Sequence, residues 1–253
     1  MLPLRHKRTE RRRISVIAAQ VNPVEAGTFP PVAADADAHP GITFYRQLTG
    51  HDPAEADIGC DDDFDRHVLA SIVAVSAMDG GAIAERTGLS EEELNGLLVR
   101  HFSSSGLRAF AWTPRPVSQL DDEAAMVRDL LETKRSTEGK VGGWLAAMIA
   151  RRAMEPNHLW EDLGLRDRSE LTRLLMRHFA PLATRNTGNM RWKRFFYRML
   201  CEDDGLVMCT TPVCTQCRDF DLCFGEESGE SRMAERRREA MRDGNGLADA
   251  VQR

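Results

Sequence analysis

Four cysteines lie close together near the C-terminal end of this 253-residue chain, at a spacing that suits a metal site. They are Cys209, Cys214, Cys217 and Cys223, in the pattern C-x4-C-x2-C-x5-C, and the chain has six cysteines in all. Thiolates this close can converge on one centre, because soft sulfur ligands bind iron–sulfur clusters, zinc and copper(I). Disulfides or loose thiols are the alternatives, although one regulatory disulfide would leave two of the four cysteines without a role.

The rest of the sequence indicates that these thiols stay reduced. No apolar run approaches the length of a transmembrane helix. The apolar stretch 14–19, which follows the basic N-terminus, is too short for the core of a signal peptide. We therefore expect a cytoplasmic protein with no membrane partner. In that compartment a cysteine cluster is more often a metal or redox site than a disulfide framework.

The spacing of the cysteines favours an iron–sulfur cluster over zinc. Structural zinc sites usually combine two separated C-x2-C pairs, whereas this segment has one such pair. The C-x4-C-x2-C run matches the first three ligands of plant-type ferredoxins, whose fourth cysteine lies far away in sequence. A cluster is also wider than one zinc ion, so ligands on one continuous segment can surround it. Zinc remains the alternative.

The composition predicts an all-α fold. The chain is rich in Leu, Ala, Met, Arg and Glu, and it has only two tyrosines, which favours helices over sheet. Its net charge of −5 argues against nucleic-acid binding as the main task. We find no nucleophile–base pair, phosphate-binding loop or dinucleotide fingerprint. The sequence therefore predicts a binding or metal-trafficking protein and no enzyme.

Changes in composition divide the chain into four expected parts. Residues 1–40 are rich in Pro and Ala and lack a helical or strand period, so we expect a disordered tail. Residues 41–205 form the helical domain, and residues 206–225 the cysteine-rich, cluster-binding segment. Residues 226–253 are highly charged and read as a solvated C-terminal helix or tail.

Apolar residues recur at helical spacing through the expected domain. The stripes are Leu69, Ile72 and Val73; Leu94, Leu97, Leu98, His101 and Phe102; Ala124, Val127, Leu130 and Leu131; and Trp192, Phe195, Phe196 and Met199. Ser90 and Glu93 predict a capping box at the start of the second helix. The third helix is expected over 123–133, and the last helix before the cysteines over 190–201.

The domain contains an internal helix-pair duplication, with units at about 69–102 and 145–179. Seven of ten positions are identical between 93–102 and 170–179. Two units are too few for a solenoid, so we expect a pseudo-symmetric helical domain. Asp167 and Glu170 are expected to repeat the capping box in the second unit.

The duplication places His101 and His178 at equivalent positions on apolar stripes. Two such histidines could bind one metal if the units face each other. Histidines on apolar faces are more often hydrogen-bonded core residues, and we favour that interpretation.

The sequence around the cysteines resembles the NifQ family of nitrogen-fixation proteins. The resemblance is carried by Met-Arg-Trp-Lys-Arg-Phe-Phe-Tyr at 190–197 and by the cysteine pattern closed by Phe-Gly-Glu at 224–226. Asn-His-Leu-Trp-Glu-Asp-Leu-Gly-Leu at 157–165 and Arg-His-Phe at 177–179 add to it. The likeness is strong over 140–227, weaker over 40–140 and absent at both tails.

This resemblance implies a molybdenum donor for the iron–molybdenum cofactor of nitrogenase. Such a protein carries a molybdenum–iron–sulfur cluster, obtains molybdenum as molybdate or from another source, and passes it to the NifEN scaffold and the NifH iron protein. The four cysteines would then hold the cluster. Cys201, His158 and His178 are candidates for an additional molybdenum ligand.

The basic face of the last helix, formed by Arg191, Arg194 and Arg198, could attract molybdate or balance the charge of a cluster. A solvated face or a docking surface is the plainer interpretation of these arginines. Two other functions fit the same residues. One is a zinc-stabilised binding or regulatory module that uses the basic helix on nucleic acid, and the other is a molybdenum-free iron–sulfur electron carrier.

Overall fold

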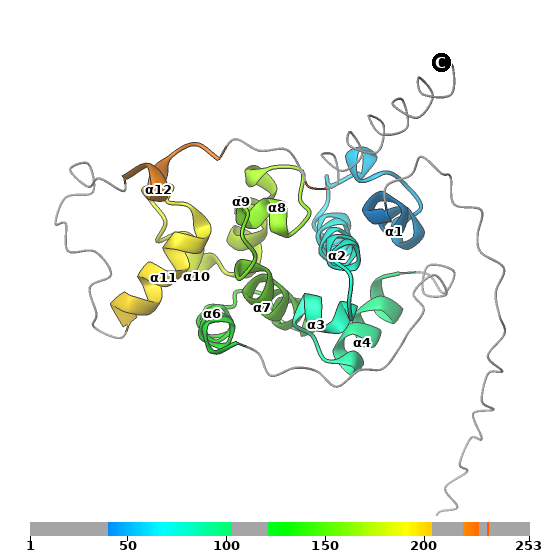
Figure 1. Cartoon of the computed structure of the whole chain (residues 1–253), viewed down its shortest axis with the longest axis horizontal. Coiled ribbons are helices and arrows are strands. Elements are labelled where there is room, and N and C mark those ends of the chain that lie inside the picture. Colours follow the sequence, from blue (N-terminus) through cyan, green and yellow to red (C-terminus); the bar gives the residue numbers. More distant parts are fainter. Residues whose placement is uncertain (1–39, 103–120, 204–219, 228–231, 233–253) are drawn as a thin grey trace, which may run out of the picture. The chain divides into compact units, whose positions relative to one another are not determined.

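The computed structural model describes residues 40–102, 121–203, 220–227 and 232 (Figure 1). These residues are mostly helical and contain no strand, which confirms the all-α prediction for this part of the chain. The elements are α1 Pro40–Thr49, η1 Pro53–Glu55, α2 Asp61–Met78, α3 Ile83–Thr87, α4 Glu91–His101, α6 Asp122–Thr133, α7 Lys140–Ala153, α8 Leu159–Asp162, α9 Arg168–His178, α10 Ala180–Ala183, α11 Trp192–Asp203 and α12 Phe220–Phe224. None of the described helices is long and apolar enough to cross a membrane.

Several sequence predictions fall outside the described residues. These are the disordered tail up to residue 39, the cysteine-rich segment up to residue 219, and the charged C-terminal part except for residues 226, 227 and 232. They stay predictions.

The expected apolar stripes form the core of the helical body. The four apolar residues predicted for α6 are all buried, and so are the four predicted for α11. The stripe residues of α2 are completely buried, and the leucines of α4 line the same core. The structure places α11 two residues later than predicted. These helices form because each buries one apolar face against its neighbours.

The two predicted capping boxes have different outcomes. At α4, the Glu93 backbone N–H donates to Ser90 Oγ and the Ser90 backbone N–H donates to the Glu93 carboxylate, which confirms the box. At α9, the Asp167 carboxylate accepts from the Glu170 backbone N–H, as expected. The Glu170 carboxylate instead accepts from the backbone N–H of Arg166, one residue earlier than a capping box requires. The second box is therefore half formed.

Glu170 is drawn away from the cap by a buried polar chain that joins α1, α2 and α9. The Tyr45 hydroxyl lies 2.7 Å from His67 Nδ1, and His67 Nε2 lies 3.3 Å from Glu170 Oε2. Tyr45, His67 and Glu170 are all nearly inaccessible to solvent. Although burial raises the pKa of Glu170, hydrogen bonds from His67 and Arg166 outweigh it and lower that pKa. The sequence did not predict α1.

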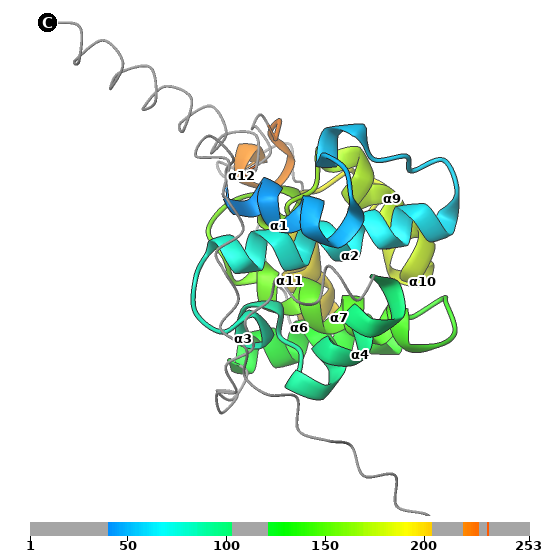
Figure 2. The same ribbon diagram turned by 90° about the vertical axis from the view of Figure 1, so that its right-hand side faces the viewer.

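The two helix-pair units interlock. The first unit contains α2, α3 and α4, and the second contains α7, α8 and α9 in the same order. From the second unit, α7 packs against α3 and α4 of the first, near the middle of the described helices (Figure 2). His101 on α4 lies edge-on to Trp144 on α7, with ring centroids 6.0 Å apart. This order of elements fits a duplication, which itself stays a prediction.

His178, the equivalent of His101 in the second unit, contacts α2 of the first unit. Its Nε2 lies 2.9 Å from Asp65 Oδ1, and its Nδ1 lies 2.8 Å from Thr137 Oγ1. Arg177 donates to both oxygens of Asp65, at 2.8 and 2.9 Å. His178 is therefore a buried, hydrogen-bonded core residue, the interpretation that the sequence favours.

Gly88 allows α3 to approach α7 closely. Its φ of +71° lies in the left-handed region, and Gly164 has the equivalent place in the second unit with a φ of +70°. A Cβ atom on Gly88 would lie 2.7 Å from Arg151 Cβ and 2.9 Å from the Ala147 carbonyl oxygen. A side chain at this position would push the two units apart.

We expect Gly88→Ala to lower the free energy of unfolding by about 3 kcal/mol, because left-handed strain and overpacking add together. Gly50→Ala is the matched control, since Gly50 has a φ of +89° but no atom within 4 Å of a Cβ. It should lower the free energy of unfolding by about 1 kcal/mol, from strain alone. Urea unfolding of the two variants measures both values. Equal losses would contradict the close packing of α3 on α7.

Candidate metal centre

The predicted cysteine segment connects two described helices. It follows α11, the helix whose Trp192, Phe195, Phe196 and Met199 are buried in the core. It ends in α12, which carries Cys223. Cys209, Cys214 and Cys217 lie outside the described residues. The structure therefore places one of the four predicted ligands and the helix that precedes the segment.

Cys223 is held beside the start of α11. The Arg191 backbone N–H donates to the Cys223 carbonyl oxygen at 2.8 Å. Phe220 and Phe224 stack with ring centroids 4.9 Å apart, and a Cβ on Gly188 would lie 3.4 Å from the Phe224 ring. The Cys223 side chain is half-buried. One end of the cysteine segment is thus fixed against the loop that enters α11.

Arg191 continues this attachment after Cys223. Its guanidinium donates to the Gly225 carbonyl oxygen at 3.3 Å and to the Glu226 carbonyl oxygen at 2.9 Å. A Cβ on Gly225 would lie 2.4 Å from the Asp221 carbonyl oxygen and 3.0 Å from Arg191 Nη2, so glycine is needed here. Arg191 therefore binds the protein's own backbone, whereas the sequence favours a solvated or docking face for it, with attraction of molybdate as the alternative.

The other two arginines of the predicted basic face differ from Arg191. Arg198 Nε donates to Glu202 Oε1 at 2.8 Å, and both side chains are exposed. Arg194 is exposed on the same helix. Exposed ion pairs of this kind contribute little to stability. The geometry fits the plainer interpretation of a solvated or docking surface.

Glu227 provides a further attachment after the cysteines. Its side chain is 4% exposed, and Arg168 Nη1 donates to its Oε1 at 2.5 Å. The other Arg168 nitrogen, Nη2, donates to the carbonyl oxygens of Asn189 and Met190 at 3.1 and 2.9 Å. Arg168 at the start of α9 therefore holds both the loop before α11 and the chain after Cys223. His158 Nδ1 lies 4.0 Å from the same Glu227 oxygen.

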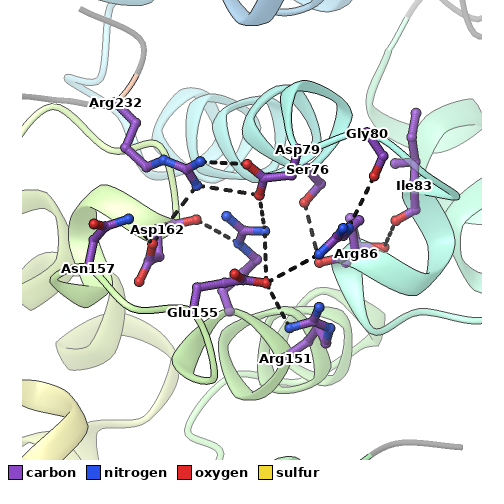
Figure 3. A network of polar contacts seen from close by, with 12 residues as sticks. Ser76, Asp79, Gly80, Ile83, Arg86, Arg151, Glu155, Asn157, Asp162 and Arg232 are labelled. Atoms are coloured by element: carbon purple, nitrogen blue, oxygen red, sulfur yellow. Dashed lines mark hydrogen bonds and ion pairs between the residues drawn. The ribbon is translucent and has the colours of Figure 1, made fainter. Parts of the chain in front are cut away.

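A polar network joins the ends of α2, α7 and α8 (Figure 3), and Lys193 of α11 also reaches it. Arg152 is completely buried, and its Nη1 donates to Asp79 Oδ2 at 2.7 Å while its Nε donates to the Asp162 carbonyl oxygen at 2.7 Å. Lys193 Nζ donates to Asp162 Oδ2 at 2.6 Å. Arg232 Nη2 donates to Asp79 Oδ1 at 2.5 Å. We call Asp79, Arg152, Asp162, Lys193 and Arg232 the buried charge network; Arg152 and Asp162 are completely buried, and the other three side chains are 12% to 19% exposed.

The charges of this network depend on one another. Burial alone raises the pKa of Asp79, but hydrogen bonds from Arg232 and Arg152 outweigh it and hold that pKa below its usual value. Burial lowers the pKa of Lys193 and of Arg152, and their carboxylate partners offset part of that effect. Loss of Asp162 would leave the Lys193 ammonium without its carboxylate partner, whereas Asp79 has two partners, Arg152 and Arg232.

The three candidates for an additional ligand lie in different surroundings. Cys201 is half-buried in the last turn of α11, and His158 is the N-cap residue of α8 beside Glu227. Both ring nitrogens of His178 are engaged by Asp65 and Thr137, so a metal could bind it only by displacing one of them. Among the described residues, no three His, Cys, Asp or Glu side chains form a group that could hold a metal ion. Four thiolates nevertheless suit iron or zinc, and three of them lie beyond the described part.

The sequence did not predict the buried charge network. One signal was present: Arg152 lies three residues after Ile149 and four after Met148, on the apolar face of the helix, where a charge must be paired. Its partner Asp79 could not be found in this way, because nothing local links the two residues.

Comparison with known proteins identifies the family. The family model described as NifQ matches residues 68–225, a range that includes both helix-pair units and all four clustered cysteines. Protein NifQ homolog of Sinorhizobium fredii (strain NBRC 101917 / NGR234) is 43% identical over 173 residues, which cover 67% of this chain and 75% of the relative. Protein NifQ of Azotobacter vinelandii is 35% identical over 208 residues, 76% of this chain and 98% of the relative. Protein NifQ of Rhodobacter capsulatus is 37% identical over 161 residues, 63% of this chain and 87% of the relative.

No solved structure matches the chain significantly. The match of the family model and the three relatives agree with the resemblance seen in the sequence. On these matches, the chain belongs to the NifQ family.

Proposed function

We propose that this chain, as a member of the nitrogen-fixation NifQ family, carries molybdenum in an iron–sulfur cluster and delivers it for synthesis of the iron–molybdenum cofactor of nitrogenase. Cys209, Cys214, Cys217 and Cys223 hold the iron of that cluster. The observation that carries the proposal is the cysteine segment itself, which lies inside the matched range and whose last cysteine is fixed by Arg191. The cluster is the cargo of a donor protein, and the proposal involves no catalytic turnover.

The position of the cysteines suits a donor. The segment connects α11 and α12, whereas the core of the described body is built from apolar side chains. A cluster held by one connecting segment can be loaded and released while the core stays folded. Release requires that molybdenum has weaker or fewer protein ligands than iron, which the thiolates bind firmly. A protein that binds iron firmly and molybdenum weakly is suited to deliver molybdenum, and less suited to store it permanently.

Two of the candidate molybdenum ligands are well placed for this role. Cys201 lies in the last turn of α11, shortly before the cysteine segment, and His158 lies beside Glu227, shortly after it. His178 is less suitable because Asp65 and Thr137 engage both its nitrogens. We therefore propose Cys201 or His158 as the additional ligand.

The acceptors proposed for molybdenum are the NifEN scaffold and the NifH iron protein, and molybdate is a possible source of the metal. The exposed Arg194 and the exposed Arg198–Glu202 pair make α11 a charged surface before the cysteine segment. Such a surface can steer a partner of complementary charge toward the cluster. Reduced thiolates require a reducing compartment, and we propose that the protein acts in the cytoplasm.

Anaerobic reconstitution with iron, sulfide and molybdate tests this function. We expect iron, acid-labile sulfide and molybdenum to co-purify with the protein, together with an EPR signal from the reduced or oxidised cluster. One zinc per chain, without iron or sulfide, would contradict the proposal and support the zinc module. Iron without molybdenum, even after molybdate is supplied, would support the electron carrier.

Serine substitutions test the ligand assignment. We expect Cys217→Ser and Cys223→Ser to lower the iron and molybdenum content severalfold, because a hydroxyl is a poor ligand for these metals. Cys60→Ser is the matched control: Cys60 is exposed and caps α2, and serine caps helices well. All three variants should keep the helical circular dichroism of the unaltered protein. Unchanged metal content in both cluster variants would contradict the assignment.

A further inference from the structure

The buried charge network lies where the two helix-pair units meet. A shift of 76 residues relates the units, from Leu69 to Leu145, and it pairs Ser76 with Arg152 and Arg86 with Asp162. The same backbone contact occurs in both units: Ser76 Oγ donates to the Arg86 carbonyl oxygen at 3.5 Å, and Arg152 Nε donates to the Asp162 carbonyl oxygen at 2.7 Å (Figure 3). The side chains differ, however. The second unit has a buried arginine and a buried aspartate where the first has a serine and an arginine.

Two cations of this network, Lys193 and Arg232, belong to neither unit. Lys193 comes from the first turn of α11, before the cysteine segment, and its Nζ donates to Asp162 Oδ2 at 2.6 Å. Arg232 comes from the chain after the cysteine segment, and its guanidinium donates to Asp79 Oδ1 at 2.5 Å. Arg232 Nη1 also lies 3.9 Å from Asp162 Oδ1. Asp162 is completely buried. Of the two cations near its carboxylate, Lys193 precedes the cysteines in the chain and Arg232 follows them.

These contacts are fixed more firmly than surface ion pairs. Arg152 already donates to Asp79, and Asn157 Nδ2 donates to Asp162 Oδ1 at 3.0 Å. These contacts hold the carboxylates of Asp79 and Asp162 in place independently of Lys193 and Arg232. A buried carboxylate that loses one cation keeps its desolvation cost, so each cation contributes more here than in water.

We propose that Asp79 and Asp162 act as a clamp that closes the stretch from Lys193 to Arg232, which contains α11 and the cysteine segment, with Lys193 and Arg232 as positioning residues for the cluster. This inference rests on the proposed function, because it assigns the clamp to the proposed cluster site. Closing the ends of a segment removes part of the conformational entropy that the ligands would otherwise lose on binding. The clamp thereby favours convergence of the four thiolates, although neither cation touches the cluster.

Arg232→Gln tests the clamp, with Arg232→Lys as the conservative variant. Arg86→Gln is the matched control, because Arg86 Nη1 lies 3.8 Å from Glu155 in the same region but belongs to neither end of the cysteine segment. The first measurement is hydrogen–deuterium exchange of residues 220–227 in the metal-free protein. The second is the rate at which reconstituted protein loses iron to a chelator.

We expect Arg232→Gln to accelerate amide exchange in 220–227 and to accelerate iron loss about tenfold, the scale of outer-shell effects on metal affinity. Arg232→Lys should restore most of both, and Arg86→Gln should change neither. Unchanged exchange in Arg232→Gln would overturn the clamp. Faster exchange with unchanged iron loss would overturn its positioning role. Failure of the unaltered protein to bind iron would contradict the proposed function instead, and exchange would then decide on the clamp alone.

Discussion

The completely buried guanidinium of Arg152 is the constraint on which the rest of the structure depends. A charge in that position is tolerated only when carboxylates and carbonyl groups surround it. Asp79 at the end of α2 and the carbonyl oxygen of Asp162 at the end of α8 supply those partners. The first unit, the second unit and the two chain segments beside the cysteines are thus joined at one place, through a few charges that depend on one another.

The helical body has a simple role in this arrangement. Its units interlock, since α7 packs against α3 and α4 while His178 and Arg177 of α9 bind Asp65 of α2. The helical body holds the start of α11 in two ways: it buries the aromatic face of α11, and its Asp162 binds Lys193. It fixes the chain after Cys223 through Arg191, Arg168 and the buried carboxylates. The proposed cluster thus has a firm support at each end and a segment between them that supplies most of the ligands.

Local sequence signals predicted the helices well, and the cysteine chemistry stays a prediction. The stripe in α6 and the capping box at Ser90 depend on residues a few positions apart, and the structure has both as expected. The capping role of Glu170 failed because Arg166, four positions away, and His67, 103 positions away, both bind the same carboxylate. Asp79 pairs with Arg152 over 73 positions and with Arg232 over 153. No periodicity or spacing rule connects residues so far apart, so the network that holds the site appeared only in three dimensions. The short α1 was missed because its burial depends on α2.

We propose that molybdenum travels in a sulfur-bound cluster held by the clamped cysteine segment. X-ray absorption at the molybdenum edge, on protein loaded anaerobically with iron, sulfide and molybdate, tests this proposal. We expect sulfur neighbours around molybdenum and iron scatterers beyond them. A spectrum with oxygen neighbours alone, as for bound molybdate, would contradict it.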